Sequence, residues 1–158
     1  MQGPPSRAVS FDSAGGVELV ELWATDETPE VPRENGDPVL EMASFTPGLN
    51  GSRFRLVKFP PATEGAELDA QAVLQEVEEK APGEWNFEED APGMHTTDTV
   101  DYGVVISGEI SLVLDDGAAL SLKQGDCVVQ NGTRHAWNNT GSEPCWMAFV
   151  MIGAQRRS

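Results

Sequence analysis

The sequence predicts an all-β fold in which short antiparallel strands close into a barrel or sandwich. After residue 92 the chain consists of short runs of β-branched and apolar residues, broken by Gly, Asp and Asn at intervals of about ten residues. Between two of these runs, Asp115-Asp116-Gly117 is a strong signal for a β-hairpin. The chain after residue 81 offers no helices for parallel βαβ units, so an antiparallel arrangement fits best.

Six strands are expected in this C-terminal half, and closing them into a barrel would remove exposed sheet edges. The last run, 146–152, is apolar at every position, which is typical of a strand that packs on both faces. We therefore expect it in the core. The expected strands are 100–106, 110–114, 118–122, 127–130, 135–138 and 146–152.

The N-terminal half is predicted to be an irregular extension of the barrel. Short strand-like runs at 17–24 and 53–59 flank a Pro- and acid-rich loop, 25–38. Good helix formers with an apolar stripe follow at 66–80 and predict one short helix.

The length of 158 residues suits one domain with a single core. We expect that domain to cover residues 1–158, with the N-terminal strands, loop and short helix in 1–90 and the barrel core in 91–152. Cys127 and Cys145 lie in apolar segments without CxxC spacing, which predicts buried, reduced thiols.

The charge of the chain excludes one class of partner. Ten Lys and Arg against 26 Asp and Glu give a net charge of -16, which would repel a phosphate backbone, so no nucleic-acid partner is expected. No stretch approaches the roughly 20 apolar residues of a membrane span, and the first ten residues do not resemble a signal peptide. We therefore expect no membrane association and a cytoplasmic location.

The two histidines of the chain, His95 and His135, both lie in the barrel half. Positions 95, 97 and 101 share parity, so His95, Thr97 and Asp101 would point to the same side of an extended chain. The turn residues Asn131-Gly132 reverse the chain just before His135. The second histidine can therefore meet the first group across a small barrel.

These segments resemble the two motifs of the cupin superfamily, over about residues 90 to 152. The first motif has a glycine, an H-x-H pair, a glutamate and a second glycine; here Thr97 replaces the second histidine and Asp101 replaces the glutamate. In the second motif, Gln130-Asn131-Gly132 stands for P-x-G. The remaining matching positions are Gly93, His95, Gly108, Gly125, Asp126, His135 and Asn139.

The resemblance implies a fold, a metal and a site. The fold would be the cupin double-stranded β-helix, a jelly-roll barrel, with an irregular N-terminal extension and a short helix. Cupins bind a divalent transition metal such as Fe, Zn, Mn or Ni through three His and one Glu. His95, Asp101 and His135 would form a 2-His-1-carboxylate set, which leaves coordination positions for substrate. Thr97 would then hydrogen-bond a metal-bound water.

Two further residues are candidates for the barrel cavity, each with a structural alternative. Trp137 shares parity with His135 and would line either the cavity or the core. Arg55 alternates with apolar residues on its strand, where it would either orient an anionic substrate or lie on a solvated face.

Three functions remain open at this point. The first is a metal-dependent enzyme acting on a small organic molecule in the barrel, by dioxygenase chemistry or as a lyase, isomerase or dehydratase. The second is a metal-free dehydratase or isomerase in which His95, Asp101 and His135 act as acids and bases. The third is a non-catalytic module that binds a small ligand. By resemblance to small cupins we also expect a homodimer, with the N-terminal strands extending a sheet across a two-fold axis.

Overall fold

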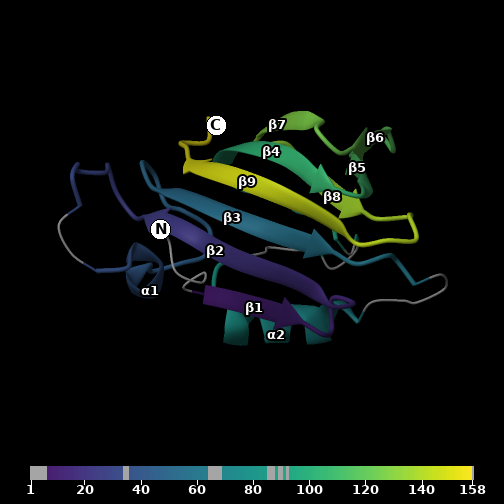
Figure 1. Ribbon diagram of the computed structural model, residues 1–158, viewed down its shortest axis with the longest axis horizontal. Coiled ribbons are helices and arrows are strands. Elements are labelled where there is room, and N and C mark those ends of the chain that lie inside the picture. Colours follow the sequence, from purple (N-terminus) through teal and green to yellow (C-terminus); the bar gives the residue numbers. More distant parts are fainter. Residues whose placement is uncertain are drawn as a thin grey trace.

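The computed structural model describes residues 7–33, 36–63, 69–84, 88, 91 and 93–157, which fold into two antiparallel sheets (Figure 1). The larger sheet has the strand order β1-β2-β3-β9-β4-β7, and the smaller has the order β6-β5-β8. The strands are β1 (Arg7–Phe11), β2 (Val17–Thr25), β3 (Ser52–Phe59), β4 (Thr99–Ser107), β5 (Glu109–Leu114), β6 (Ala119–Lys123), β7 (Cys127–Asn131), β8 (His135–Asn138) and β9 (Cys145–Gly153). The described helices are α1 (Pro38–Glu41) and α2 (Ala70–Lys80).

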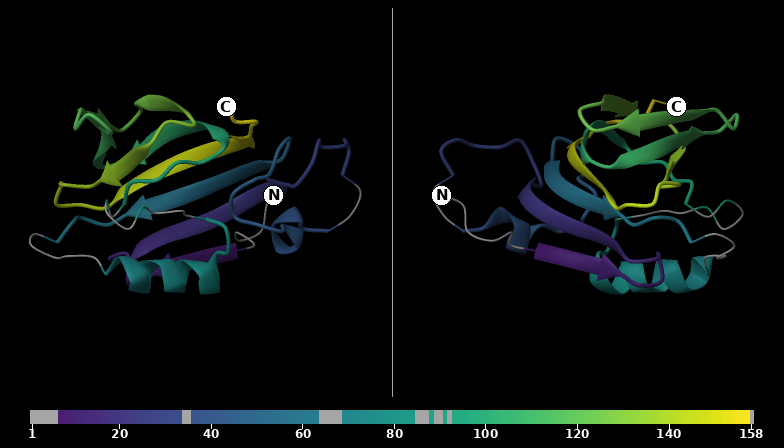
Figure 2. Two further views of the ribbon diagram at one scale, coloured as in Figure 1. Left: turned by 180° about the vertical axis from the view of Figure 1, so that it is seen from behind. Right: turned by 45° about the vertical axis from the view of Figure 1, so that its right-hand side comes forward.

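The smaller sheet and α2 cover different parts of the larger sheet. Figure 2 shows the smaller sheet beside β4 and β9 and shows α2 next to β1 and β2. Asp69 caps α2 by accepting hydrogen bonds from the backbone N–H groups of Gln71 and Ala72. Val73 and Val77 of this helix are buried against an apolar group on the inner side of β1 and β2. That group also contains Phe11, Leu19, Phe45 and Ala81.

Side chains of the large sheet alternate strictly between an inner and an outer face. In β4, Thr99, Asp101, Gly103 and Val105 are buried, whereas Tyr102, Val104 and Ile106 are exposed. The same alternation in β9 buries the side chains of one face and leaves those of the other half-buried. The strand at 146–152 is therefore central in its sheet, but its outer face is only partly covered.

The inner face has an apolar end and a polar end. At the apolar end, Val57, Met147 and Val105 occupy one row across three strands. Two rows further along, Arg53, Met151, Asp101 and Gln130 lie side by side across β3, β9, β4 and β7. The buried polar side chains thus gather at one end of the inner face, and the apolar core fills the other.

The predicted strands are confirmed, with ends that differ by at most one residue. Residues 70–80 of the predicted helix are helical, while 66–68 lie outside the described residues. Two elements were missed: β1, which is five residues long, pairs only at the sheet edge, and α1 is a single turn that begins at the last residue of the predicted loop, Pro38. The described residues contain no helix that is both long and apolar enough to cross a membrane.

The prediction that both cysteines are buried is wrong for Cys127. Cys145 is buried, but Cys127 is exposed. In the pairing of β4 with β7, Cys127 lies opposite Val104, which belongs to the outer face. Although Cys127 lies in an apolar segment, its side chain points to the outer face of the sheet, which no other element covers in the described part of the chain.

Candidate functional site

The two histidines lie together between the sheets. His135 begins β8, and His95 pairs with it through an antiparallel bridge with backbone N···O distances of 2.9 and 3.0 Å. Their ring centroids are 4.4 Å apart, and the exposed fractions are 9% for His95 and 3% for His135. The two histidines therefore meet, but as neighbours on adjacent backbone segments and not across the barrel.

Backbone carbonyl groups orient both imidazole rings. Nδ1 of His95 lies 3.0 Å from the carbonyl oxygen of Gly93, and Nδ1 of His135 lies 2.9 Å from that of Thr133. A carbonyl can only accept, so Nδ1 must carry the proton and Nε2 carries the lone pair. Burial lowers the pKa of His95, and burial with the neighbouring His95 lowers the pKa of His135 to about 4. Both rings are therefore neutral at pH 7.

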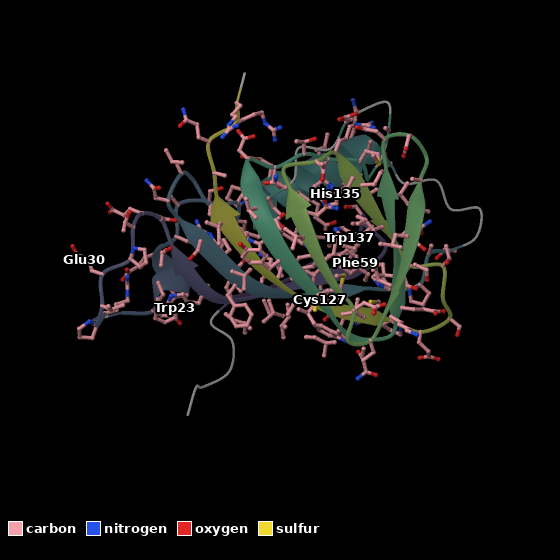
Figure 3. The ribbon with its side chains drawn as sticks, turned by 90° about the horizontal axis from the view of Figure 1, so that it is seen from above. Trp23, Glu30, Phe59, Cys127, His135 and Trp137 are labelled. Carbon is pink, nitrogen blue, oxygen red and sulfur yellow. The ribbon has the colours of Figure 1, made fainter. Side chains whose placement is uncertain are left out.

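Aromatic side chains form the wall beside the histidines. Trp137 meets the His135 ring edge-on, with centroids 5.7 Å apart and an interplanar angle of 86°. It also packs against Phe149 at 5.6 Å and Phe59 at 6.1 Å. Figure 3 shows His135, Trp137 and Phe59 following one another between the two sheets. Trp137 thus touches both the candidate site and the apolar core.

Asp101 lies on the inner face of β4, with an exposed fraction of 7%. Burial raises the pKa of its carboxyl group to about 6, although a hydrogen bond from Thr99 and the charge of Arg55 both oppose the shift. Its Oδ1 atom has no hydrogen-bond partner within the described part of the chain. Among the described residues, no three His, Cys, Asp or Glu side chains converge on a point where they could hold a metal. The structure therefore brings His95 and His135 together and leaves Asp101 outside that pair.

Thr97 is half-buried and precedes β4. Its Oγ1 lies 2.7 Å from Oγ1 of Thr99, the residue whose hydroxyl group reaches Asp101. Thr97 also lines a cavity of about 460 Å³ at the ends of the strands, together with Asn131 and Arg156. Thr99, which sequence reasoning passed over, is the threonine that contacts the carboxylate; it shares the parity of Asp101, and that was the available signal.

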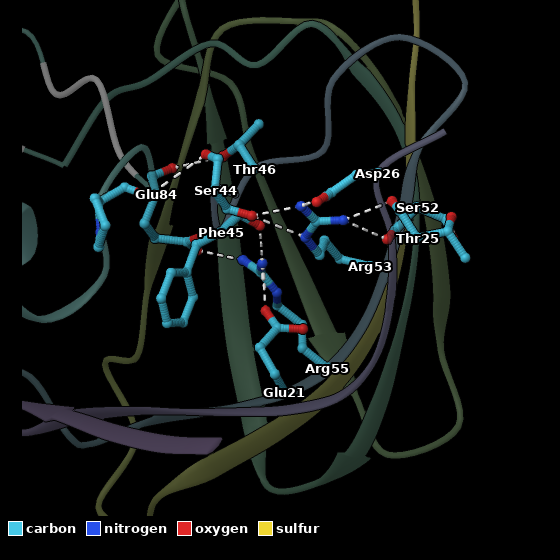
Figure 4. A network of polar contacts seen from close by, with 11 residues as sticks. Glu21, Thr25, Asp26, Ser44, Phe45, Thr46, Ser52, Arg53, Arg55 and Glu84 are labelled. Carbon is cyan, nitrogen blue, oxygen red and sulfur yellow. Dashed lines mark hydrogen bonds and ion pairs between the residues drawn. The ribbon is translucent and has the colours of Figure 1, made fainter. Parts of the chain in front are cut away.

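Arg55 is not on a solvated face, since its exposed fraction is 2%. Its guanidinium group pairs with Glu21 of β2 and with Glu84 after α2, and it donates to the carbonyl oxygen of Phe45 (Figure 4). Burial raises the pKa of Glu21 to about 7, which the charge of Arg55 only partly offsets. These protein groups occupy most of the guanidinium donors that an anionic substrate would need.

Arg53 is buried in the same way, two residues earlier on β3 (Figure 4). It pairs with Asp26 at 2.5 Å and donates to the carbonyl oxygens of Thr25 and Ser44 at 2.7 and 3.0 Å. Both arginines therefore join the large sheet to the segment that follows α1, and Arg53 also joins it to the loop between β2 and α1.

Among the described residues, the two imidazole groups are suitable ligands for a transition metal. A histidine that binds a metal usually donates its second ring N–H to a carbonyl or carboxylate group, and both rings do this. Two neutral imidazoles are ligands that Fe, Zn, Mn and Ni accept. His95 and His135 would then supply two ligands, and the remainder would have to come from water, substrate or another part of the chain.

Comparison with protein families assigns the fold. The model of the cupin domain family Cupin_2 matches residues 78–152, a segment that contains both histidines and strands β4 to β8. The chain belongs to the cupin superfamily. Its two antiparallel sheets are the cupin barrel, and the resemblance found in the two sequence motifs is confirmed.

Several relatives of this cupin are fungal proteins. It is 35% identical over 143 residues to phomopsin biosynthesis cluster protein C' of Diaporthe leptostromiformis, a match that covers 89% of this chain and 64% of that protein. It is 40% identical over 138 residues to the cupin-domain-containing oxidoreductase virC of Hypocrea virens, with 83% and 56% covered. The cupin thus spans less than two thirds of the length of these relatives. Among solved structures, a cupin 2 conserved barrel domain protein from Salinispora arenicola matches with a TM-score of 0.42 and 16% identity, over 83% of this chain and 75% of that one.

Proposed function

We propose that this cupin is an oxidoreductase that acts on a small organic molecule beside His95 and His135, in a biosynthetic pathway. The observation that carries the proposal is the pair of buried, neutral imidazoles, each oriented by a backbone carbonyl group. Relatives that match more than four fifths of this chain are named as a biosynthesis cluster protein and as a cupin-domain-containing oxidoreductase. In this proposal a divalent transition metal, Fe, Zn, Mn or Ni, is the cofactor.

The residues of the chain would have distinct tasks in such a reaction. His95 and His135 would hold the metal through Nε2, because Nδ1 of each ring is engaged with a carbonyl group. Fe, Mn or Ni, which have two accessible valences, would supply the electron transfer that side chains alone lack, whereas Zn would not. Trp137 and Phe149 would exclude water from the reacting centre and bind the apolar part of the substrate.

A second candidate function rests on Asp101. A carboxyl group with a pKa of about 6 exchanges its proton near neutral pH, as a general acid or base must. Asp101 could then catalyse an isomerisation or dehydration without a metal, with a neutral histidine as hydrogen-bond partner of the substrate. Retained turnover in the presence of a strong chelator would favour this function over the first.

Metal content tests the first proposal directly. Protein purified without a His tag should contain about one transition metal per chain, as measured by inductively coupled plasma mass spectrometry. His95→Ala and His135→Ala should each lose most of that metal while far-UV circular dichroism stays unchanged. Asn138→Ala, at the exposed end of the same strand as His135, is the matched control and should keep it. Metal-free wild-type protein, or variants that retain the metal, would contradict the proposal.

The reaction class can be read from the mass of the product. The loaded protein would be incubated with a panel of small metabolites, and the products analysed by mass spectrometry. An oxidoreductase changes the substrate by hydrogen or oxygen atoms, whereas a dehydratase removes water and an isomerase leaves the mass unchanged. Products that differ from their substrates only by water, or not at all, would favour the acid–base function instead.

We also propose that two copies of the chain form a homodimer through the outer face of the large sheet. Apolar side chains with exposed fractions of 38% to 62% occupy this face, and they are Phe54, Tyr102, Val104, Ile106, Val129 and Ile152. No charged side chain interrupts the two central rows, which run from β2 through β3, β9 and β4 to β7. Because each chain carries a net charge of -16, two copies repel least where the contact surface is uncharged.

A further inference from the structure

Asp101 and Gln130 lie directly opposite each other on the inner face of the barrel. They are partners in the register of β4 with β7, which brings their Cβ atoms to about 5 Å. Their exposed fractions are 7% and 4%. Although they are this close, Oδ1 of Asp101 and Nε2 of Gln130 form no hydrogen bond with each other or with any other described group. A buried acceptor and a buried donor are therefore adjacent and both unpaired.

Thr133 sets the orientation of the Gln130 amide group. Its hydroxyl group donates to Oε1 of Gln130, which identifies Oε1 as the engaged end of the amide and Nε2 as the other end. The carbonyl group of the same residue accepts from Nδ1 of His135 at 2.9 Å. One turn residue thus orients both the amide of Gln130 and the imidazole of His135, so the two side chains belong to one polar assembly.

Leaving a buried polar atom unpaired is destabilising, so native proteins rarely keep two of them side by side without a use. The two atoms present a complementary pattern to a third molecule: Nε2 of Gln130 donates, and Oδ1 of Asp101 accepts. A group that carries an acceptor next to a donor, such as C=O beside N–H or O–H, satisfies both at once. An ion would match one of them and leave the other unpaired.

We propose that Gln130 and Asp101 anchor the substrate of this cupin, a neutral molecule in which a carbonyl oxygen lies beside an N–H or O–H group. The carbonyl oxygen accepts from Gln130, and the N–H or O–H donates to Asp101. This inference rests on the proposed function to the extent that the substrate binds in the barrel near His135. Thr133 is a positioning residue, because it acts on the ligand only through Gln130.

Two small probes that differ by one hydrogen-bond donor test the anchor. 2-Pyridone carries C=O beside N–H, whereas N-methyl-2-pyridone has the same ring and carbonyl group without the donor. Binding would be followed by the side-chain amide NMR signal of Gln130, identified by its loss in Gln130→Leu. We expect 2-pyridone to shift this signal and to bind about tenfold or more tightly than the N-methyl compound, since the latter leaves Asp101 unpaired.

Variants separate anchoring from folding. Gln130→Leu should weaken 2-pyridone binding about tenfold or more, as measured by calorimetry, and Gln124→Leu, at an exposed position, should not change it. Thr133→Val keeps the carbonyl group that orients His135 and removes the hydroxyl group, so it should lower affinity without changing metal content. The proposal would be overturned if the two probes bound equally or if Gln130→Leu left binding unchanged. It would also be overturned if neither probe bound, in which case a water molecule would be the partner of both atoms. Metal content is measured independently, so its loss or absence would count against the proposed function and not against the anchor.

Discussion

Glu21→Gln should change how the stability of the barrel depends on pH. The Glu21 side chain is fully buried, and its pKa of about 7 compares with an ordinary value of 4.5. Between these two values the folded protein holds a proton that the unfolded chain has released. The free energy of unfolding should therefore fall as pH rises from about 4.5 to about 7, by about 3 kcal/mol from this carboxyl group alone.

Glutamine keeps the shape of the side chain but does not titrate, so the variant should lose this part of the pH dependence. Urea denaturation of both proteins at several pH values between 4 and 8 would measure the difference. Relative to the wild type, Glu21→Gln should gain stability as pH rises through that range. Glu18→Gln is the control, because Glu18 lies on the outer face of the same strand in a half-exposed ion pair with Lys58. Parallel curves for wild type and Glu21→Gln would refute the assignment of a protonated, desolvated Glu21.

Three further outcomes follow from the structure. Asp101→Asn should abolish turnover while the barrel stays folded, as measured by circular dichroism; unfolding would instead assign Asp101 to a structural network. Val104→Lys should convert a dimer to a monomer in light scattering at moderate salt, whereas Leu120→Lys, with an exposed fraction of 57% on the smaller sheet, should not; a wild-type monomer would contradict the dimer. Gly103→Ala should destabilise the fold by about 1–3 kcal/mol in urea denaturation, because its new Cβ would lie 2.9 Å from the ring of Phe149; an unchanged midpoint would mean that the ring moves freely.

The barrel could be predicted because its strands are patterned locally. Runs such as 100–106 and 146–152 alternate or are apolar throughout, and turn residues separate them, so each strand can be recognised without its partner. The meeting of His95 and His135 followed from parity and from the turn at Asn131-Gly132. Cys127 shows the limit of this reasoning, because alternation assigns a residue to a face but does not say whether that face is covered.

The charged part of the inner face could not be predicted in the same way. Arg55 lies on an alternating strand, where a cation suggests a solvated face, and its partners Glu21 and Glu84 are 34 and 29 residues away in the sequence. Only the tertiary fold brings the three together. Gln130 was matched to a motif position normally held by proline, so its unpaired amide became visible only when its register with Asp101 was known.

The buried group of Glu21, Arg55 and Glu84 makes thermostability and function competing aims in this protein. Replacing such a buried ionic group as a whole by apolar side chains of similar volume is often neutral or stabilises a fold by 1–4 kcal/mol, whereas removing one member alone is strongly destabilising. Laboratory selection for heat resistance would therefore favour apolar side chains at this end of the barrel interior. The charge of Arg55 also lowers the pKa of Asp101, so the more heat-resistant protein would have a different Asp101 pKa and therefore a changed substrate anchor. Stabilising changes that leave the substrate-binding interior intact should instead be sought away from this end of the barrel.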